Sequence, residues 1–247
     1  MLKGVFFDLF GTLLVYCEMQ KAWEDWLLAL YKNFKKCGLK ISQKSFALEC
    51  DGIMSKPEPI TGEEHLTVYE KRLFSLGFKL NLKLESENIR KMANDSINAW
   101  QKYVPLDPDA ISVLKVLKER KSLALITNFD HPPFVYSLLS DMKLRDFFDS
   151  IVISGEVGVK KPNPLIFSFA LKKINLQPKE VCYIGDTEDD MKAARSAKIY
   201  PILIRRKNHL DSGKVDDYNL DRTYNKIEKE IEYSKKIANL KELITII

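Results

Sequence analysis

The sequence of 247 residues predicts an α/β fold, in which a parallel sheet is interrupted by an inserted all-helical domain. After residue 105, short apolar runs rich in β-formers alternate with amphipathic segments, which indicates parallel strands joined by helices. Residues 16–104 show helical spacing alone. With 45% hydrophobic residues, the chain can bury a full core. We therefore expect a sheet domain made of residues 1–15 and 105–247, and a helical domain made of residues 16–104.

The first strand is predicted at Val5–Phe7, where an apolar run ends abruptly in Asp8. An aspartate that ends a buried strand is costly unless it lies at the open carboxyl end, where α/β sheets place their ligands. Gly11 permits a tight turn after it, and Thr12 adds a hydroxyl group. We expect Asp8 to face solvent at this strand end. The alternative is a strand followed by an ordinary Asx turn.

Residues 16–104 contain four amphipathic segments in succession, each with signals for a helix start or end. Gly38 stops the first segment, and Ser42 can cap the second. The run Thr61–Glu64 has the pattern of a capping box before the third segment, which Gly77 closes. Ser86 can cap the fourth. The spacing predicts a four-helix bundle, and the aromatic residues along it are interpreted as core.

Four more strands are predicted after the insertion, with helices between them. The strands are expected at 123–127, 151–153, 181–184 and 200–204, and the helices at 133–142, 164–174 and 189–197, after one that carries Ile111, Leu114 and Leu117. Such alternation implies a parallel sheet with helices on both faces. The strand before Asp8 belongs to the same sheet. The polar tail from Asn208 shows no clear pattern until a last helix expected at 239–247.

The composition excludes several classes of protein. The chain has no stretch of about 18 apolar residues that could span a membrane, and its start lacks the features of a signal peptide. Its four cysteines show neither C-x-x-C spacing nor a nearby histidine, which favours reduced thiols. The net charge is +5, and the densest basic run, Arg205–Lys207, is short. We expect a cytoplasmic protein that binds anionic small molecules but neither nucleic acid nor membrane, and the sequence is compatible with a monomer.

A distinct polar group stands near the end of each of four segments in the sheet domain. They are Asp8 after the first strand, Thr127 and Asn128 after the second, Lys161 after the third, and Asp186 after the fourth, with Asp189 and Asp190 just beyond. In a parallel sheet these ends converge on one crevice. The crevice would hold a nucleophile, a hydroxyl and an amide to grip an anion, a cation, and acids for a metal.

With these residues in this order, the chain resembles the haloacid dehalogenase superfamily of aspartate-nucleophile hydrolases. The first motif matches Asp8–Thr12, the second Ile126–Asn128, the third Lys161–Pro164 and the fourth Gly185–Asp190. The match covers the sheet domain, and the helical insertion resembles the C1-type cap of that superfamily. The resemblance implies a Rossmann-like parallel sheet core with an inserted all-helical cap domain.

The resemblance also implies roles for the site residues. Asp8 would attack phosphorus and form an aspartyl-phosphate, which water then hydrolyses. Asp186 and Asp190 resemble the acids of the magnesium site, and Asp8 and the carbonyl of Phe10 would share the ion. Such an all-oxygen ligand set is what Mg²⁺ prefers.

By the same resemblance, Thr127, Asn128 and Lys161 would hold the transferring phosphoryl oxygens, each as a preorganised donor. Lys160 competes with Lys161, and the superfamily pattern favours the residue immediately before proline. Asp189 competes with Asp190, whose spacing fits the pattern better. We interpret His131, which follows the second motif, as an exposed loop histidine.

One departure from the superfamily leaves the reaction open. Most of its phosphatases carry a second aspartate two residues after the nucleophile, as general acid and base, and this chain has Phe10 there. Its 2-haloacid dehalogenases also lack that acid, but they usually lose the acidic metal site and use an early cap arginine, whereas the first arginine here is Arg72. The sequence therefore favours a magnesium-dependent phosphatase acting on a small phosphorylated metabolite. The alternatives are a metal-independent 2-haloacid dehalogenase and a weakly active protein that binds a phosphorylated ligand or a partner protein.

Overall fold

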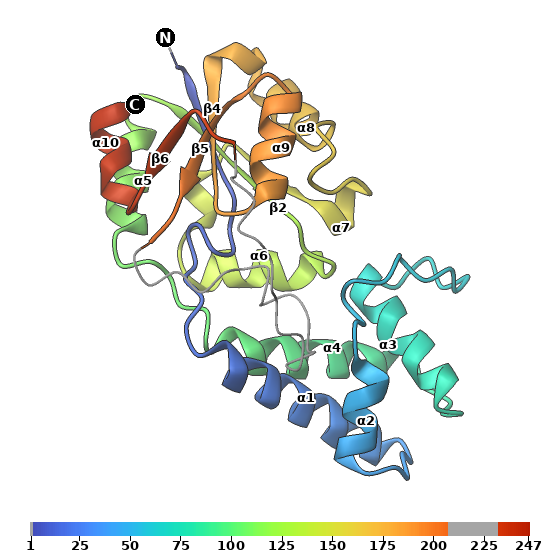
Figure 1. The fold of residues 1–247 in the computed structure, drawn as a ribbon. Helices are drawn as coiled ribbons and strands as arrows, with labels where there is room; N and C mark the ends of the chain where they lie inside the picture. Colours follow the sequence, from blue (N-terminus) through green and yellow to red (C-terminus); the bar gives the residue numbers. More distant parts are fainter. Residues whose placement is uncertain (1, 207–231) are drawn as a thin grey trace. The chain divides into compact units, whose positions relative to one another are not determined.

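The computed structural model describes residues 2–206 and 232–247. The described residues fall into two compact units (Figure 1). Residues 2–16, 106–206 and 232–247 belong to a unit built on a sheet, and residues 17–105 belong to a unit made of helices. The domain boundaries expected from the sequence, between residues 15 and 16 and between residues 104 and 105, stay a prediction.

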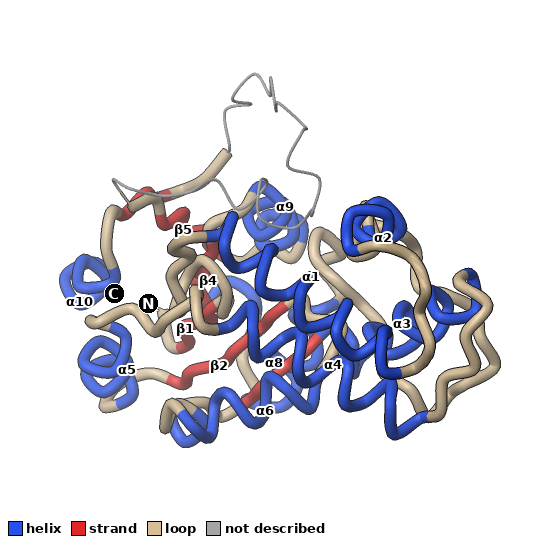
Figure 2. The backbone as a smooth tube through the Cα atoms, turned by 90° about the horizontal axis from the view of Figure 1, so that it is seen from below, coloured by secondary structure: helices blue, strands red, loops and turns tan. Residues whose placement is uncertain are grey.

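The sheet has six parallel strands in the order β3-β2-β1-β4-β5-β6 (Figures 1 and 2). The strands are β1 (Gly4–Phe7), β2 (Ser122–Thr127), β3 (Ser150–Ile153), β4 (Val181–Gly185), β5 (Tyr200–Ile204) and β6 (Lys235–Ile237). The predicted α/β fold with a parallel sheet is thus confirmed. Strand β6 was not predicted, because only Ile237 of its three residues is buried and the strand has no apolar run.

The strand order places β1 in the middle of the sheet. The chain runs outward from β1 to β2 and β3, and then returns to form β4 on the other side of β1. Phe7 in β1 is in register with Leu125 in β2 and with Ile184 in β4. The carboxyl ends of β1 and β4 therefore lie side by side at the point where the strand order reverses, which is where open α/β sheets bind ligands.

Helices cover both faces of this sheet. They are α5 (Ala110–Lys118), α6 (Pro132–Asp141), α7 (Ser154–Val157), α8 (Ile166–Ile174), α9 (Glu188–Ser196) and α10 (Leu243–Ile246), with short 3₁₀ turns at Arg145–Phe147, Pro178–Glu180 and Leu240–Glu242. Residues of α8 and α9 share one buried cluster with Phe6 and Tyr183 of the sheet. Helices α5 and α10 lie on the opposite side of the strands (Figure 1). Because both faces are covered, the strands read as continuous apolar runs.

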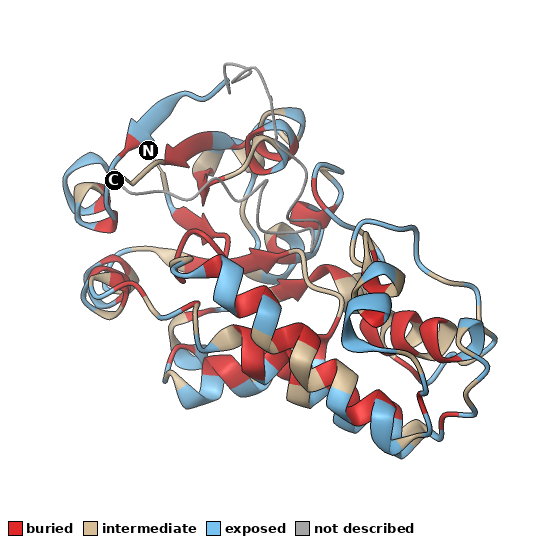
Figure 3. Ribbon diagram, turned by 60° about the horizontal axis from the view of Figure 1, so that its bottom comes forward, coloured by how far each residue is buried: buried red, intermediate tan, exposed pale blue. Residues whose placement is uncertain are grey.

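The helical unit consists of α1 (Met19–Lys36), α2 (Gln43–Cys50), α3 (Val68–Lys79) and α4 (Ser86–Gln101). Helix α1 packs along α4, and α3 also packs on α4. Buried and exposed residues alternate around α1 and α4 (Figure 3), as expected for amphipathic helices. None of the helices in the described parts of the chain is both long and apolar enough to cross a membrane.

The start of α3 corrects one sequence prediction. The capping box is formed by Thr67 and Glu70, whose side chains bond each other's backbone N–H groups, and not by Thr61 and Glu64. Both pairs have the same Thr-x-x-Glu pattern, so two equivalent capping signals stand six residues apart. Gly77 does not end the helix either: it lies inside α3, where the Leu84 side chain packs so closely that a Cβ would lie 2.4 Å from Leu84 Cδ1.

Candidate active site

Asp8 directly follows β1, and its backbone N–H donates a 2.9 Å hydrogen bond to the carbonyl of Ile184 in β4. Its side chain is buried, with the residue 5% exposed, so the expectation that Asp8 faces solvent was wrong. The sequence could show that Asp8 ends a strand, but not that neighbouring segments cover it. A carboxylate buried in this way needs compensating contacts.

Lys161 supplies the first of these contacts. Its Nζ donates to Asp8 Oδ1 at 2.6 Å and lies 2.7 Å from Asp190 Oδ1. It also donates to the Tyr183 hydroxyl at 2.8 Å and to the Ile126 carbonyl at 3.2 Å. Lys161 is buried, whereas Lys160 is exposed. Of the two neighbouring lysines, Lys161 is therefore the one whose charge reaches Asp8.

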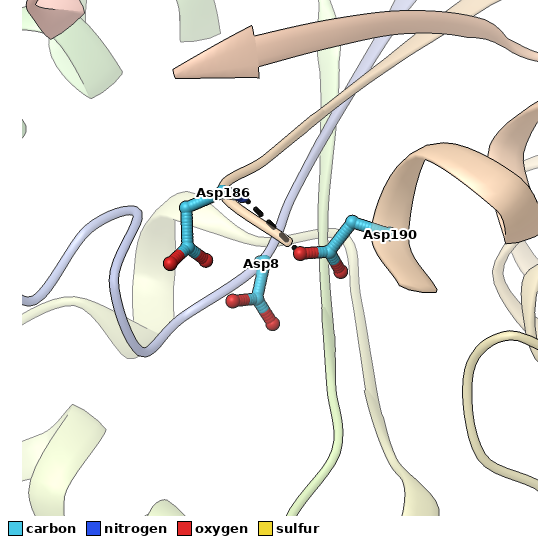
Figure 4. A group of neighbouring side chains, drawn as sticks. All are labelled: Asp8, Asp186 and Asp190. Atoms are coloured by element: carbon cyan, nitrogen blue, oxygen red, sulfur yellow. Dashed lines mark hydrogen bonds between the residues drawn. The ribbon is translucent and has the colours of Figure 1, made fainter. Parts of the chain in front are cut away.

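Three buried carboxylates meet beside this lysine (Figure 4). One oxygen from each of Asp8, Asp186 and Asp190 can be chosen so that all three lie within 4.8 Å of one another. Close backbone approach makes this possible. At Gly11, where φ is +84°, an added Cβ would lie 2.2 Å from Asp186 Oδ2. At Gly185, an added Cβ would lie 2.5 Å from Asp190 Cβ. Only glycine fits either position.

Residues just before α9 fix the orientation of Asp190, which lies in the first turn of that helix. Its Oδ2 accepts hydrogen bonds from the Thr187 hydroxyl at 2.6 Å, from the Thr187 N–H at 3.0 Å and from the Asp186 N–H at 3.2 Å. Its Oδ1 accepts from the Tyr183 hydroxyl at 2.9 Å and faces Lys161. Asp189 is exposed on the same helix. Of the two neighbouring acids, Asp190 is therefore the one that contacts the site.

The buried charges shift one another's pKa values. Burial raises the pKa of Asp8 to about 7, although the Lys161 charge opposes this shift. Burial also acts to raise the pKa of Asp190, but the charge and hydrogen bond of Lys161 outweigh it and hold that pKa below its ordinary value. Burial acts to lower the pKa of Lys161, yet the charges of Asp190 and Asp8 raise it above its ordinary value. Lys161 therefore stays charged, and Asp8 titrates near neutral pH.

The same residues fit a divalent cation. Among the described residues of this site, three carboxylates surround the single positive charge of Lys161. The cluster therefore carries excess negative charge once Asp8 is ionised. The donors are all hard oxygen ligands, which suit Mg²⁺ better than a soft metal. The sequence also predicted the Phe10 carbonyl as a ligand, and this stays a prediction.

The remaining predicted donors differ in what they contact. Thr127, the last residue of β2, is 1% exposed at the same sheet edge. The side chain of Asn128 bonds the backbone of Lys161 twice: its Nδ2 donates to the Lys161 carbonyl at 3.0 Å, and its Oδ1 accepts from the Lys161 N–H at 2.9 Å. These bonds tie Asn128 to the backbone of Lys161 and use one of the two Nδ2 hydrogens, so the predicted contact of Asn128 with phosphoryl oxygens stays a prediction.

An aromatic row stands where the superfamily pattern leads one to expect the second aspartate. The ring of Phe10 stacks on Phe129 with centroids 4.9 Å apart, and Phe129 stacks on Phe134 at 5.6 Å. Phe10 is 7% exposed. His131, between these residues in sequence, is 2% exposed, so its interpretation as an exposed loop histidine was wrong. The cause is its place at the start of α6, where the chain turns back into the core.

Two residues of this region were missed by the sequence analysis. Tyr183 places its hydroxyl among Lys161, Asp190 and the Ile126 carbonyl, and burial raises its pKa well above the ordinary value, so it stays a neutral donor. A tyrosine inside an otherwise apolar strand was a usable signal, since a buried hydroxyl needs a partner. Arg206, at the end of β5, bonds the loop after Asp8. Its sequence context, a short basic run, gave no such signal.

Comparisons with known proteins agree with this geometry. A curated relative, the glyceraldehyde 3-phosphate phosphatase of Methanopyrus kandleri, is 33% identical over 127 residues, which are 49% of this chain and 54% of that protein. The chain thus spans about half the length of this relative.

Solved structures match over nearly the whole chain. A HAD phosphatase from Thermococcus onnurineus has a TM-score of 0.64 at 22% identity, over 99% of this chain and 97% of that one. A 2-haloacid dehalogenase from Pseudomonas syringae pv. Tomato has a TM-score of 0.65 at 18% identity, over 100% and 98% of the two chains. At these identities the structures show a shared fold. The model of the haloacid dehalogenase-like hydrolases matches residues 2–198, so the chain belongs to this family of hydrolases.

Proposed function

We propose that this hydrolase is a magnesium-dependent phosphatase that acts on a small phosphorylated metabolite through an aspartyl-phosphate at Asp8. The observation that carries the proposal is the contact of Lys161 with both Asp8 and Asp190, in a cluster that also includes Asp186. The proposed nucleophile Asp8 and the positive charge of Lys161 thus share one buried site with two further acids at the carboxyl edge of the sheet.

The first half of the reaction forms a bond between a carboxylate oxygen of Asp8 and phosphorus, while the bond from phosphorus to the ester oxygen breaks. The leaving alkoxide takes a proton from water as it departs and leaves as the alcohol. Lys161 stabilises the negative charge of the transferring phosphoryl group. The Thr127 hydroxyl, at the same edge of the sheet, binds a phosphoryl oxygen. Because Lys161 is already fixed by Asp190 and Tyr183, it needs little reorganisation when charge develops.

The second half hydrolyses the aspartyl-phosphate with water and restores the Asp8 carboxylate. Splitting one difficult displacement into two easier steps is the advantage of a covalent intermediate. A cation held by Asp8, Asp186, Asp190 and the Phe10 carbonyl would offset the repulsion between the acids and a phosphate dianion. Asn128 keeps Lys161 in place through both steps by its two bonds to the lysine backbone.

The relative from Methanopyrus kandleri supports the substrate class, since it is named for the hydrolysis of a small phosphorylated compound. One observation favours a second candidate, a 2-haloacid dehalogenase in which Asp8 attacks carbon. Phe10 and its aromatic row occupy the place of the general acid, and halide leaves without a proton. Against this candidate stand Asp186 and Asp190, which a metal-independent enzyme would not need beside its nucleophile.

A two-substrate assay tests the proposal. The full chain is incubated with p-nitrophenyl phosphate and with 2-chloropropionate, each in Mg²⁺ and in a chelator. We expect phosphate release that requires Mg²⁺, stops on chelation and returns when Mg²⁺ is restored. Chloride release at a comparable rate in the chelator would replace the phosphatase by the dehalogenase. No turnover of either substrate, or of a wider panel of phosphate esters, would leave a protein that only binds a phosphorylated ligand or a partner.

A further inference from the structure

Arg206 is bound to the turn that follows Asp8. Its Nη1 donates to the Gly11 carbonyl at 2.8 Å, and its Nη2 donates to the Thr12 carbonyl at 2.7 Å. The backbone bonds within the turn use other carbonyls: those of Leu9 and Leu14. Arg206 follows β5, almost two hundred residues later in the sequence than the turn. The guanidinium therefore adds a long-range restraint to a turn that its own bonds fix only locally.

Asp107 holds the guanidinium from the other side. Its Oδ2 accepts from Arg206 Nη2 at 2.6 Å and from Nε at 3.1 Å. Asp107 is itself fixed: its N–H donates to the Leu13 carbonyl at 2.9 Å, and its Oδ1 accepts from the Asp109 N–H at 2.8 Å. The side chains of Arg206 and Asp107 are 15% and 8% exposed. Water screens a pair this well buried much less than it screens a surface ion pair.

The restrained turn touches the acid cluster directly. Gly11 lies so close to Asp186 that an added Cβ would be 2.2 Å from Asp186 Oδ2. Asp8 stands at the other end of the same turn, three residues earlier. A displacement of Gly11 by a few tenths of an ångström would therefore change the spacing between the Asp8 and Asp186 carboxylates. That spacing decides how well the two acids can share one cation, because Mg²⁺ demands near-ideal octahedral geometry.

We propose that Arg206 is a positioning residue for the candidate active site. It holds the Gly11–Thr12 turn against Asp186 and so sets the placement of Asp8 relative to that acid. The inference rests on the proposed function, since it assumes that Asp8 and Asp186 share a cation. Arginine suits the task because its planar fork reaches Gly11, Thr12 and Asp107 at once, whereas a lysine is a point charge on a flexible stem.

The test compares Arg206→Gln and Arg206→Lys with the wild type, and with Arg205→Gln as the matched control. Arg205 is the adjacent arginine at the same strand end, and its described contact is a backbone bond from its N–H to the Ile237 carbonyl. The readouts are Mn²⁺ affinity by calorimetry, kcat and KM for p-nitrophenyl phosphate, and thermal unfolding.

We expect Arg206→Gln to remain folded, to weaken Mn²⁺ binding by about tenfold or more and to lower kcat by a similar factor, as for residues that orient metal ligands. KM should change less than kcat, because the variant leaves Lys161 in place. Arg206→Lys should recover part of the Mn²⁺ affinity, and Arg205→Gln should match the wild type. If Arg206→Gln does not fold, Asp107→Asn loosens the same clamp by removing only the charge, and it should weaken Mn²⁺ binding in the same direction.

A folded Arg206→Gln with Mn²⁺ affinity and kcat within twofold of the wild type would overturn the inference. Equal losses in Arg205→Gln would also overturn it, because the effect would then belong to surface charge. Failure of the proposed function is recognised separately: a wild type that binds Mn²⁺ but releases no phosphate removes the phosphatase, while the Mn²⁺ titrations still decide the role of Arg206.

Discussion

Each unit of this protein buries a polar network, and the two networks differ in charge. In the helical unit, Trp26 Nε1 donates to the Tyr69 hydroxyl at 2.9 Å, and that hydroxyl lies 2.7 Å from Ser96 Oγ. Ser96 Oγ in turn donates to the Met92 carbonyl at 2.7 Å. In the sheet unit, Lys161 meets Asp8, Asp190 and Tyr183 beside Asp186.

The difference shows which network serves stability. The hydrogen-bonded network from Trp26 to the Met92 carbonyl is neutral, and each of its hydroxyl groups has bonding partners, so burial leaves few unmet bonds. The cluster around Lys161 holds more negative than positive charge, and burial raises the pKa of Asp8 to about 7. A network that only stabilised the fold would not need this imbalance, whereas a site that binds a cation and an anionic substrate does.

The largest expected effect comes from removing the charge of Asp8 in the sheet network. Asp8→Asn should lower kcat by about 10³ or more, since the nucleophile is lost and only positioning and electrostatics remain. Circular dichroism should show an unchanged fold. Asp189→Asn is the matched control, because Asp189 is an exposed acid beside Asp190, and its kcat should stay near the wild-type value. Retention of more than a tenth of the activity in Asp8→Asn, with deamidation excluded by mass spectrometry, would show that another residue attacks.

Adding an acid to the aromatic row should have the next largest effect. With Phe10 in the row, the leaving oxygen has no carboxylic acid at that position, which matters most for alkyl phosphates, whose alkoxide must be protonated. Phe10→Asp should raise kcat on alkyl phosphates relative to aryl phosphates by about 10². The rings around position 10 favour the protonated acid.

Phe10→Ala separates loss of the ring from gain of the acid, and thermal unfolding must accompany the rates because Phe10 is buried. An unchanged alkyl-to-aryl ratio in folded Phe10→Asp would mean that the proton comes from elsewhere in the site. The buried His131 would then be the first residue to test.

A smaller effect concerns stability as a function of pH. Because the pKa of Asp8 is raised from 3.8 to about 7, its contribution to stability is fully present below pH 4 and is lost as pH rises through about 7. In the metal-free protein, the difference in unfolding free energy between Asp8→Asn and the wild type should therefore shift in favour of the variant by about 2 kcal/mol as the pH is raised from 5 to 8. Urea unfolding of both proteins at the two pH values measures this shift. An equal difference at pH 5 and pH 8 would show that Asp8 does not titrate in this range. Added Mg²⁺ should make the shift smaller, because it favours the ionised form of Asp8 in the wild type.

The smallest effect is expected in the neutral network. Tyr69→Phe removes the hydroxyl between Trp26 and Ser96 and should lower the unfolding free energy by about 1–2 kcal/mol, because the buried Trp26 N–H loses this acceptor. It should leave kcat unchanged. Tyr31→Phe, which removes a bond to the Ile41 carbonyl from a less buried hydroxyl, should cost less. A loss of kcat in Tyr69→Phe without a loss of stability would remove the distinction between the two networks.

The sequence by itself determined the first five strands and the polar residues at their ends. Apolar runs of β-formers identified β1 to β5, because strands covered on both faces must be apolar throughout. Since the carboxyl ends of parallel strands meet at one edge, Asp8, Lys161 and Asp186 could be expected together from their positions after strands. Both steps need only local pattern and the direction of the chain.

The tertiary structure decided which buried atoms meet. Tyr183 reaches Lys161, and Arg206 reaches Gly11 and Thr12, through the register of neighbouring strands and the packing of segments far apart in sequence. The same holds for the burial of Asp8 and His131, which the segments packed around them cause. The start of α3 also depended on the tertiary structure. Thr61 and Thr67 have the same capping pattern, and only Thr67 caps the helix. Local sequence fixes periodicity, but a contact between distant residues depends on the packing of the whole chain, which no single segment encodes.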